Sequence, residues 1–319
     1  MAAVADDIDV LVSEVGPRDG LQALARPVPT PAKHRWIAAL AAAGLREIEV
    51  ASCVPPRLLP TMADADEVIR EAARLPGVAV VALVPNLRGA ERAVAAGAAK
   101  LTVPISASRL HSAANLRRTP EEAVEELRAV CRLRDRLDPP ARPAVEVGIS
   151  TAFGCALEGP VEEAWVLRLA SRCAEAGADA VGLSDTAGHA NPAQVRRLFG
   201  ALRRELGSRA GGAHFHDTRG QGLANVVAAL DAGVATFDAS HGGLGGCPYV
   251  PGAAGNVVTE DLVFLLEAMG LRTGVDLERL LAAREVLRDA LPGEPLRGHV
   301  AEAGLPKGFV PASKAGTRA

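Results

Sequence analysis

Short apolar runs alternate with longer amphipathic stretches along almost the whole chain. Four helical stretches end in a glycine, at Gly44, Gly97, Gly177 and Gly233, and a run suited to a strand follows each. Glycine fits the left-handed conformation just past a helix end, and the β-rich run after it begins the next strand. The pattern predicts an α/β fold. Its strands are expected at residues 9–15, 46–51, 78–84, 99–105, 143–150, 179–184, 212–216 and 234–239.

Helical sequence follows each expected strand, and most of these stretches repeat apolar residues at helical spacing. The helices are expected at 32–43, 63–74, 88–96, 119–137, 161–176, 192–206, 221–232 and 259–269. Eight such units favour a closed parallel (β/α)8 barrel, a TIM barrel, formed by residues 1–290 as a single catalytic domain, with an extra helix at 276–290. A doubly wound open sheet is the alternative, but no GxGxxG motif follows the first strand and opens a helix. The irregular tail, residues 291–319, could be a lid, an interface arm or disordered.

The composition is globular and excludes several classes of partner. The chain has 319 residues, of which 49% are apolar, and this is enough for one large barrel or two ordinary domains. A net charge of -3 and 3% aromatic residues offer neither a basic field nor stacking surfaces, so no nucleic acid partner is expected. No apolar run reaches the length of a membrane span, and the first nine residues resemble no targeting peptide, so a cytoplasmic protein is expected. Five cysteines without CxxC spacing indicate neither a disulfide framework nor a thiolate zinc site.

His214 and His216 flank a single phenylalanine in the seventh expected strand. Residues two apart in a strand point to the same face, so the two imidazoles converge. Neutral ring nitrogens can hold a divalent metal together without repelling each other. The alternative is a pair of ordinary surface or core histidines.

Polar residues gather where the expected strands end, which is where the active sites of such barrels lie. They are Arg18, Asp19, Glu49, Ser52, Asp185, Thr186, His214, His216 and Asp217. Taken singly, each fits a core polar group, a solvated charge or a helix cap, as Asp185 does. Together they predict a mixed nitrogen and oxygen site for Mg²⁺, Mn²⁺, Co²⁺ or Zn²⁺ that leaves room for substrate oxygens.

Arg18 places a permanent cation beside Asp19, in a turn bracketed by glycines at the end of the first expected strand. A guanidinium in such a place can stabilise a developing oxyanion. The alternative is a structural ion pair with Glu14 or Glu49.

A glycine-rich segment, residues 242–256, follows the eighth expected strand and contains one thiol, Cys247. Pro248 biases this cysteine toward an extended backbone that presents its side chain, which makes it a candidate acid or base; the alternative is a small buried hydrophobe. Asn256 could be an oxygen ligand or a turn residue. No Lys-Ser/Thr pair follows the glycines, which argues against a phosphate-binding P-loop.

The chain resembles the 3-hydroxy-3-methylglutaryl-CoA lyase family from residue 10 to about residue 290. The segments that carry the resemblance are Glu14–Gln22 (EVGPRDGLQ), His214–Thr218 (HFHDT), Gly243–Tyr249 (GLGGCPY), Gly255–Asn256 and Thr259–Leu262 (TEDL). The first and third are specific to the lyases. The histidine strand and the Arg-Asp pair are also similar to a wider superfamily that includes isopropylmalate and homocitrate synthases. The chain departs from the family pattern at residues 52–57 and 252–255, which concerns the acyl pocket.

The resemblance implies a TIM barrel with a divalent cation, Mg²⁺ or Mn²⁺, that cleaves an acyl-CoA substrate into acetyl-CoA and a 3-oxo acid. It implies metal ligands at Asp19, His214, His216 and Asn256. It also implies a catalytic, substrate-binding arginine at Arg18, a catalytic loop cysteine at Cys247, and supporting polar residues at Glu49 and Asp185. Asp19 or a histidine of the site is the expected base.

We further expect a homo-oligomer, with a dimer favoured, and no membrane partner. Two alternatives to cleavage of 3-hydroxy-3-methylglutaryl-CoA, or of a longer 3-hydroxy-3-alkylglutaryl-CoA, stay open. One is the condensing reaction of the same superfamily, and the other is an idle barrel that binds an acyl-CoA without turning it over.

Overall fold

Eight parallel strands of the described residues close into a barrel, in which neighbours in sequence pair and β8 returns to β1. The structure is a computed structural model that describes residues 7–246 and 255–315. The strands are β1 (Leu11–Glu14), β2 (Glu47–Ser52), β3 (Ala79–Leu83), β4 (Lys100–Ser106), β5 (Ala144–Ser150), β6 (Ala180–Asp185), β7 (Ala210–Phe215) and β8 (Thr236–Ala239). The predicted TIM barrel is confirmed.

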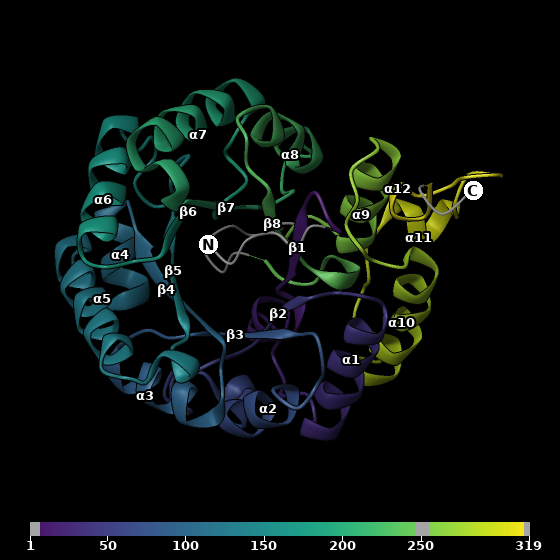
Figure 1. The fold of residues 1–319 in the computed structure, drawn as a ribbon, viewed down its shortest axis with the longest axis horizontal. Coiled ribbons are helices and arrows are strands. Elements are labelled where there is room, and N and C mark those ends of the chain that lie inside the picture. Colours follow the sequence, from purple (N-terminus) through teal and green to yellow (C-terminus); the bar gives the residue numbers. More distant parts are fainter. Residues whose placement is uncertain (1–6, 247–254, 316–319) are drawn as a thin grey trace.

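Helices form a ring around the barrel (Figure 1). They are α1 (Thr30–Ala42), α2 (Ala65–Ala72), α3 (Leu87–Ala96), α4 (Arg109–Leu116), α5 (Pro120–Asp135), α6 (Glu163–Glu175), α7 (Pro192–Leu206), α8 (Gly222–Asp231), α9 (Thr259–Ala268), α10 (Leu277–Ala290), α11 (His299–Ala303) and α12 (Ala312–Ala315). Short turns of 3-10 or π-helix occur at Gly16–Gly20, Pro60–Met62, Pro139–Ala141, Gly207–Arg209 and His241–Gly243. Within the described ranges, no helix has both the length and the apolar character that crossing a membrane requires.

Two features show how far the local pattern determines these elements. The four glycines at the helix ends have φ between 85° and 108°, which is the left-handed conformation expected of them. Helix α4 was not predicted. Its buried residues are His111 and Ser112, so the stretch lacks the apolar repeat that reveals a helix.

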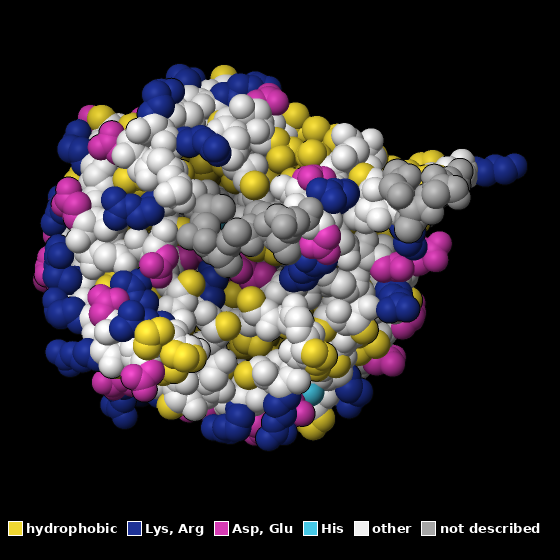
Figure 2. Space-filling view, viewed as in Figure 1, with side chains coloured by type: hydrophobic (Ala, Val, Ile, Leu, Met, Phe, Trp, Pro, Cys, Tyr) yellow, Lys and Arg dark blue, Asp and Glu magenta, His cyan; other side chains and the backbone are white. Residues whose placement is uncertain are grey.

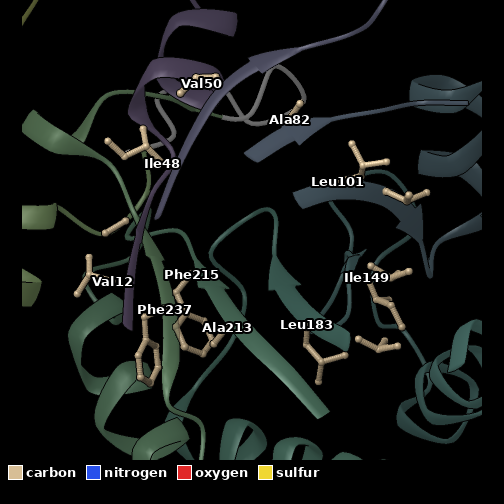
Figure 3. Close-up of a cluster of buried hydrophobic side chains, with 14 of the residues drawn as sticks. Val12, Ile48, Val50, Ala82, Leu101, Ile149, Leu183, Ala213, Phe215 and Phe237 are labelled. Carbon is tan, nitrogen blue, oxygen red and sulfur yellow. The ribbon is translucent and has the colours of Figure 1, made fainter. Parts of the chain in front are cut away.

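The hydrophobic core lies mainly between the barrel and the ring of helices (Figure 3). Every strand contributes to it, through Val12, Ile48, Val50, Ala82, Leu101, Ile149, Leu183, Ala213, Phe215 and Phe237, none of which is more than 2% exposed. The ring of Phe215 on β7, for example, packs edge-on against Phe199 of α7. Since the strand side chains alternate, the residues between these apolar ones face the inside of the barrel.

The described part of the tail packs on the outside of the barrel. Helices α11 and α12 contact α9. The backbone N–H groups of His299 and Val300 both donate to the carboxylate of Asp261, and the ring of Phe309 lies 5.0 Å from that of Phe264. These contacts give residues up to 315 a defined place along α9, while a domain boundary at residue 290 stays a prediction.

Candidate active site

The turn between β1 and α1 positions the first two candidate residues. It is a single turn of π-helix that carries Arg18 and Asp19. Glycine is required at both ends, because a Cβ at Gly16 would lie 2.6 Å from a carboxylate oxygen of Glu14, and one at Gly20 would lie 2.7 Å from Cβ of Leu244. The backbone is therefore held close to its neighbours, and the two charged side chains project at the carboxyl end of the barrel.

His214 and His216 meet Asp19 at this end of the barrel. His214 is on β7, and His216 follows that strand. The candidate ligand atoms of the three residues all lie within 4.8 Å of one another. The two Nε2 atoms are only 3.1 Å apart, and His216 Nε2 lies 4.0 Å from Asp19 Oδ2. Two imidazole nitrogens and a carboxylate that converge in this way can hold a metal ion.

Asn256 completes the cluster. It forms an antiparallel bridge with His216, and its Nδ2 donates a hydrogen bond of 2.7 Å to Asp19 Oδ2. Its Oδ1 is buried and has no hydrogen-bond partner among the described residues, and the same is true of His216 Nδ1. A buried carbonyl oxygen rarely lacks a partner. The free oxygen beside three converging donors therefore fits a bound divalent cation.

Arg18 bridges two carboxylates. Its Nε donates to Glu49 Oε2 and its Nη1 to Asp19 Oδ1, each at 2.5 Å. The ion pair with Glu49 that was weighed as an alternative is thus present, yet the same guanidinium also contacts the metal-ligand candidate. Glu14 has a different place, where it accepts from the N–H of His241 and the hydroxyl of Thr259.

The electrostatics of the cluster favour the ionised carboxylate of Asp19 and the neutral ring of His216, which are the forms that bind a metal, but they act in the opposite direction on His214. Burial would raise the pKa of Asp19, but the charges of Arg18 and the two histidines outweigh it and hold the pKa at about 2. Burial, helped by the charge of His214, lowers the pKa of His216 to about 4. For His214, burial lowers the pKa, but the hydrogen bond and charge of Asp238 outweigh it and raise the pKa.

The two supporting residues have different surroundings. Glu49 lies in the cluster through its contact with Arg18, and burial raises its pKa against the effect of that guanidinium. Asp185, at the end of β6, accepts hydrogen bonds from the backbone N–H groups of His189 and Ala190 at 2.8 and 3.0 Å. Its carboxylate therefore caps the following turn, which was the alternative interpretation from the sequence.

Two contacts of the site were missed in the sequence. Asp238 Oδ2 accepts from His214 Nδ1 at 3.0 Å. Glu260 accepts from the N–H of Gly242, the first residue of the glycine-rich segment, and forms an ion pair with Arg284. A charged residue at an inward position of β8 was a visible signal for Asp238, but its partner depends on the register between β7 and β8, which one sequence does not give.

Cys247 lies outside the described residues, so its expected role stays a prediction from the sequence.

Comparison with known proteins points to one family. The family model described as HMGL-like matches residues 9–287. The hydroxymethylglutaryl-CoA lyase of Bacillus subtilis is 42% identical over 287 residues, which cover 90% of this chain and 94% of the relative. The hydroxymethylglutaryl-CoA lyase of Pseudomonas mevalonii is 44% identical over 269 residues, which cover 84% of this chain and 88% of the relative.

A solved structure points to the same family as the family model and the two similar sequences. The HMG-CoA lyase of Acinetobacter baumannii, in complex with coenzyme A and 3-methylmalate, superposes with a TM-score of 0.88 at 37% sequence identity, and the match covers 98% of this chain and 99% of that one. The fold, the extent of the family match and the identity to these lyases together show that this chain belongs to the HMGL-like, or hydroxymethylglutaryl-CoA lyase, family.

Proposed function

We propose that this protein is a divalent-metal-dependent carbon-carbon lyase. It cleaves 3-hydroxy-3-methylglutaryl-CoA, or a related 3-hydroxy-3-alkylglutaryl-CoA, into acetyl-CoA and acetoacetate or the matching 3-oxo acid. The observation that carries the proposal is the direct contact of the Arg18 guanidinium with Asp19, which itself belongs to the cluster with His214 and His216. The names of the similar lyases support the same reaction.

Asp19, His214, His216 and Asn256 are the residues that would hold the cation. These four residues offer nitrogen and hard oxygen atoms as donors, which suits Mg²⁺ or Mn²⁺. When bound, the cation supplies Lewis-acid stabilisation to the oxygens of the substrate. The free Oδ1 of Asn256 supports this assignment.

The reaction needs a base, an anion-stabilising group and an acid. Asp19 or a histidine of the cluster takes the proton of the tertiary hydroxyl, and the bond between C2 and C3 then breaks. Its electron pair moves into the thioester, which becomes an enolate. Arg18 offers a permanent positive charge to the enolate oxygen, in surroundings where burial strengthens the interaction.

The last step returns a proton to C2 of the enolate and gives acetyl-CoA. The cysteine of the glycine-rich segment, Cys247, is the proposed donor, and this role follows from the family resemblance and the position of the residue after β8. The overall reaction consumes no other reactant.

A cavity beside the cluster supports an acyl-CoA as the substrate. It has a volume of about 510 Å³ and lies beside the residues that follow β2 and β3, on the same side of the barrel as the cluster. Arg57 and Arg88 line it, together with Arg92, which also forms an ion pair with Asp66. Guanidinium groups are suited to phosphates, so this cavity is the proposed place for the anionic end of the CoA.

A direct assay tests the proposal. The purified protein is incubated with Mg²⁺ or Mn²⁺ and 3-hydroxy-3-methylglutaryl-CoA, and acetoacetate and acetyl-CoA are quantified. Equal amounts of both products are expected, and the His214→Ala variant should form neither at a comparable rate. Tight binding without turnover would instead favour the idle acyl-CoA-binding barrel.

The same assay separates the remaining alternatives. Net formation of a longer acyl-CoA from acetyl-CoA and a 3-oxo acid would favour the condensing reaction. A panel of 3-hydroxy-3-alkylglutaryl-CoA substrates would identify the acyl preference. The dimer stays a prediction, which sedimentation of the purified protein tests.

A further inference from the structure

Asp238 lies beside His214 on the inner wall of the barrel. The two residues are direct partners in the parallel register of β7 and β8. Their side chains point to the same face, and Asp238 Oδ2 lies 3.0 Å from His214 Nδ1. This is the nitrogen on the far side of the imidazole from the metal-ligand cluster.

The contact determines which nitrogen of His214 carries the proton. A carboxylate only accepts hydrogen bonds, so Nδ1 must be the donor. In the neutral ring, the lone pair is then on Nε2, the atom that lies 3.1 Å from His216 Nε2 and close to Asp19. His214 is therefore prepared to bind a cation through Nε2.

His216 has no such support. Its outer nitrogen, Nδ1, is buried and has no hydrogen-bond partner in the ranges that the structure describes. The two histidines are thus unequal: one ring is oriented by a carboxylate, whereas the other is held by packing and by its backbone bridge to Asn256.

Asp238 is only partly buried. Its side chain is 32% exposed, although the next residues on the strand, Phe237 and Ala239, are completely buried. It borders a cavity of about 40 Å³ inside the barrel, which Ser13 and Thr102 also line. The Asp238 carboxylate therefore borders an open, polar space on one side while it contacts His214 on the other.

We infer that Asp238 is a positioning residue, which fixes the tautomer and ring orientation of His214 and so raises the affinity of the cluster for a divalent cation. A carboxylate behind a metal-binding imidazole has this effect because it orients the ring and increases its basicity. The inference rests on the metal site of the proposed function, but it does not depend on which substrate is cleaved.

Binding of Mn²⁺ to the metal-free protein tests the inference, with free Mn²⁺ followed by electron paramagnetic resonance. The Asp238→Ala variant should bind Mn²⁺ about 10- to 100-fold more weakly than the wild type. Asp238→Asn should lose less, because the amide oxygen still accepts from Nδ1.

The matched control is Glu146→Gln. Glu146 lines the same cavity and forms an ion pair with Lys100, but it does not contact the histidines. Loss of its charge should leave the Mn²⁺ affinity within about twofold of the wild type, because no metal-ligand candidate depends on it.

Two results would overturn the inference. One is a folded Asp238→Ala variant with wild-type Mn²⁺ affinity. If that variant does not fold, Asp238→Leu, which keeps a similar side-chain size but has no acceptor, decides with Co²⁺: an unchanged affinity together with an unchanged visible absorption spectrum contradicts a role in orienting His214.

The outcome is independent of the lyase assay. Weakened Mn²⁺ binding in a protein that does not cleave 3-hydroxy-3-methylglutaryl-CoA would keep the role of Asp238 and refute the proposed reaction. If the wild type cleaves 3-hydroxy-3-methylglutaryl-CoA and the Asp238→Ala variant binds Mn²⁺ as tightly as the wild type, the proposed reaction is kept and the role of Asp238 is refuted. A wild-type protein that binds no Mn²⁺ would refute both the metal assignment and this inference.

Discussion

The two faces of the barrel strands differ in chemistry. The outer face packs against the helices and is apolar, with Phe215 and Phe237 among its largest side chains. The inner face carries charges, such as Glu49, Lys100 and Asp238, which line one small cavity. In most TIM barrels, branched apolar side chains fill the interior in layers. In this protein the main hydrophobic core lies between the strands and the ring of helices. The interior of the barrel holds the charged residues instead.

Two structural features accompany the charged interior of the barrel: glycines where neighbouring strands approach closely, and ion pairs between the buried charges. Glycines at Gly182 and Gly212 let neighbouring strands approach closely, since a Cβ at Gly182 would lie 2.6 Å from the carbonyl oxygen of Gly212. Below the metal-ligand cluster, Lys100 forms ion pairs with Glu47 and Glu146. These three charges therefore have partners of opposite sign, which is what makes their burial tolerable.

Charged side chains of both signs also occur on the surface of the molecule. In the space-filling view, basic and acidic side chains are interspersed over this face of the molecule (Figure 2). A substrate with phosphates and a carboxylate would approach a surface of mixed sign, which suits recognition by specific contacts rather than by a broad field.

The largest expected effect is on the outer face. Phe237→Ala should lower the free energy of unfolding by about 3–5 kcal/mol, because it removes a fully buried ring and leaves a cavity. Denaturant unfolding measures this. The exposed Leu58, truncated to alanine, is the control and should change stability by less than about 0.5 kcal/mol. If the folded Phe237→Ala protein lost its affinity for Mn²⁺, this would contradict the claim that residues of the outer face stabilise the fold without affecting the metal site.

Next in size is an effect on the inner face. Arg18→Gln should lower kcat by about 100- to 1,000-fold, equal to about 2.7–4 kcal/mol, because the enolate loses its cation. Mn²⁺ affinity should stay near normal, since Arg18 is not a ligand candidate. Arg109→Gln is the control, because Arg109 pairs with Glu121 on the surface. An unchanged kcat in a folded Arg18→Gln protein would refute the assignment.

Metal removal should change stability through the inner face alone. At a Mn²⁺ concentration about 100 times its Kd, binding should stabilise the wild type by about 2.7 kcal/mol relative to protein in chelator. Unfolding curves recorded with and without the ion measure the difference. The His214→Ala variant should show a much smaller difference, and an equal one would place the ion elsewhere.

The smallest effect concerns Asp185. Asp185→Ala should destabilise the protein by about 1–2 kcal/mol, as the loss of a capping side chain does, while Mn²⁺ affinity stays within about twofold. Asp231→Ala, which breaks a surface ion pair with Arg196, provides the comparison and should cost less than about 1 kcal/mol. A large loss of Mn²⁺ affinity in Asp185→Ala would show instead that Asp185 contributes to the metal site.

The sequence predicts the outer face better than the inner one. Apolar periodicity and glycines at helix ends locate each strand, because burial against the helices imposes a regular pattern. Apolar periodicity does not reveal helix α4, because polar side chains form its buried face.

The site is predictable where residues share a strand or a turn. His214 with His216 and Arg18 with Asp19 are such pairs, and the structure brings all four together. His214 and Asp238 are 24 residues apart in sequence, and their contact depends instead on the register between β7 and β8. Likewise, the sequence could not show that Arg18 contacts Glu49 and Asp19 at once, because that depends on how the π-helical turn packs against β2.

The central claim is that one divalent ion, held by Asp19, His214, His216 and Asn256, makes the inner face catalytic. The most direct test titrates Mn²⁺ into the metal-free protein and follows bound ion and cleavage of 3-hydroxy-3-methylglutaryl-CoA in the same samples. We expect acetoacetate formation to rise in proportion to bound Mn²⁺ and to level off at one ion per chain. Full activity in the metal-free protein, or saturation with Mn²⁺ without any cleavage, would contradict the claim.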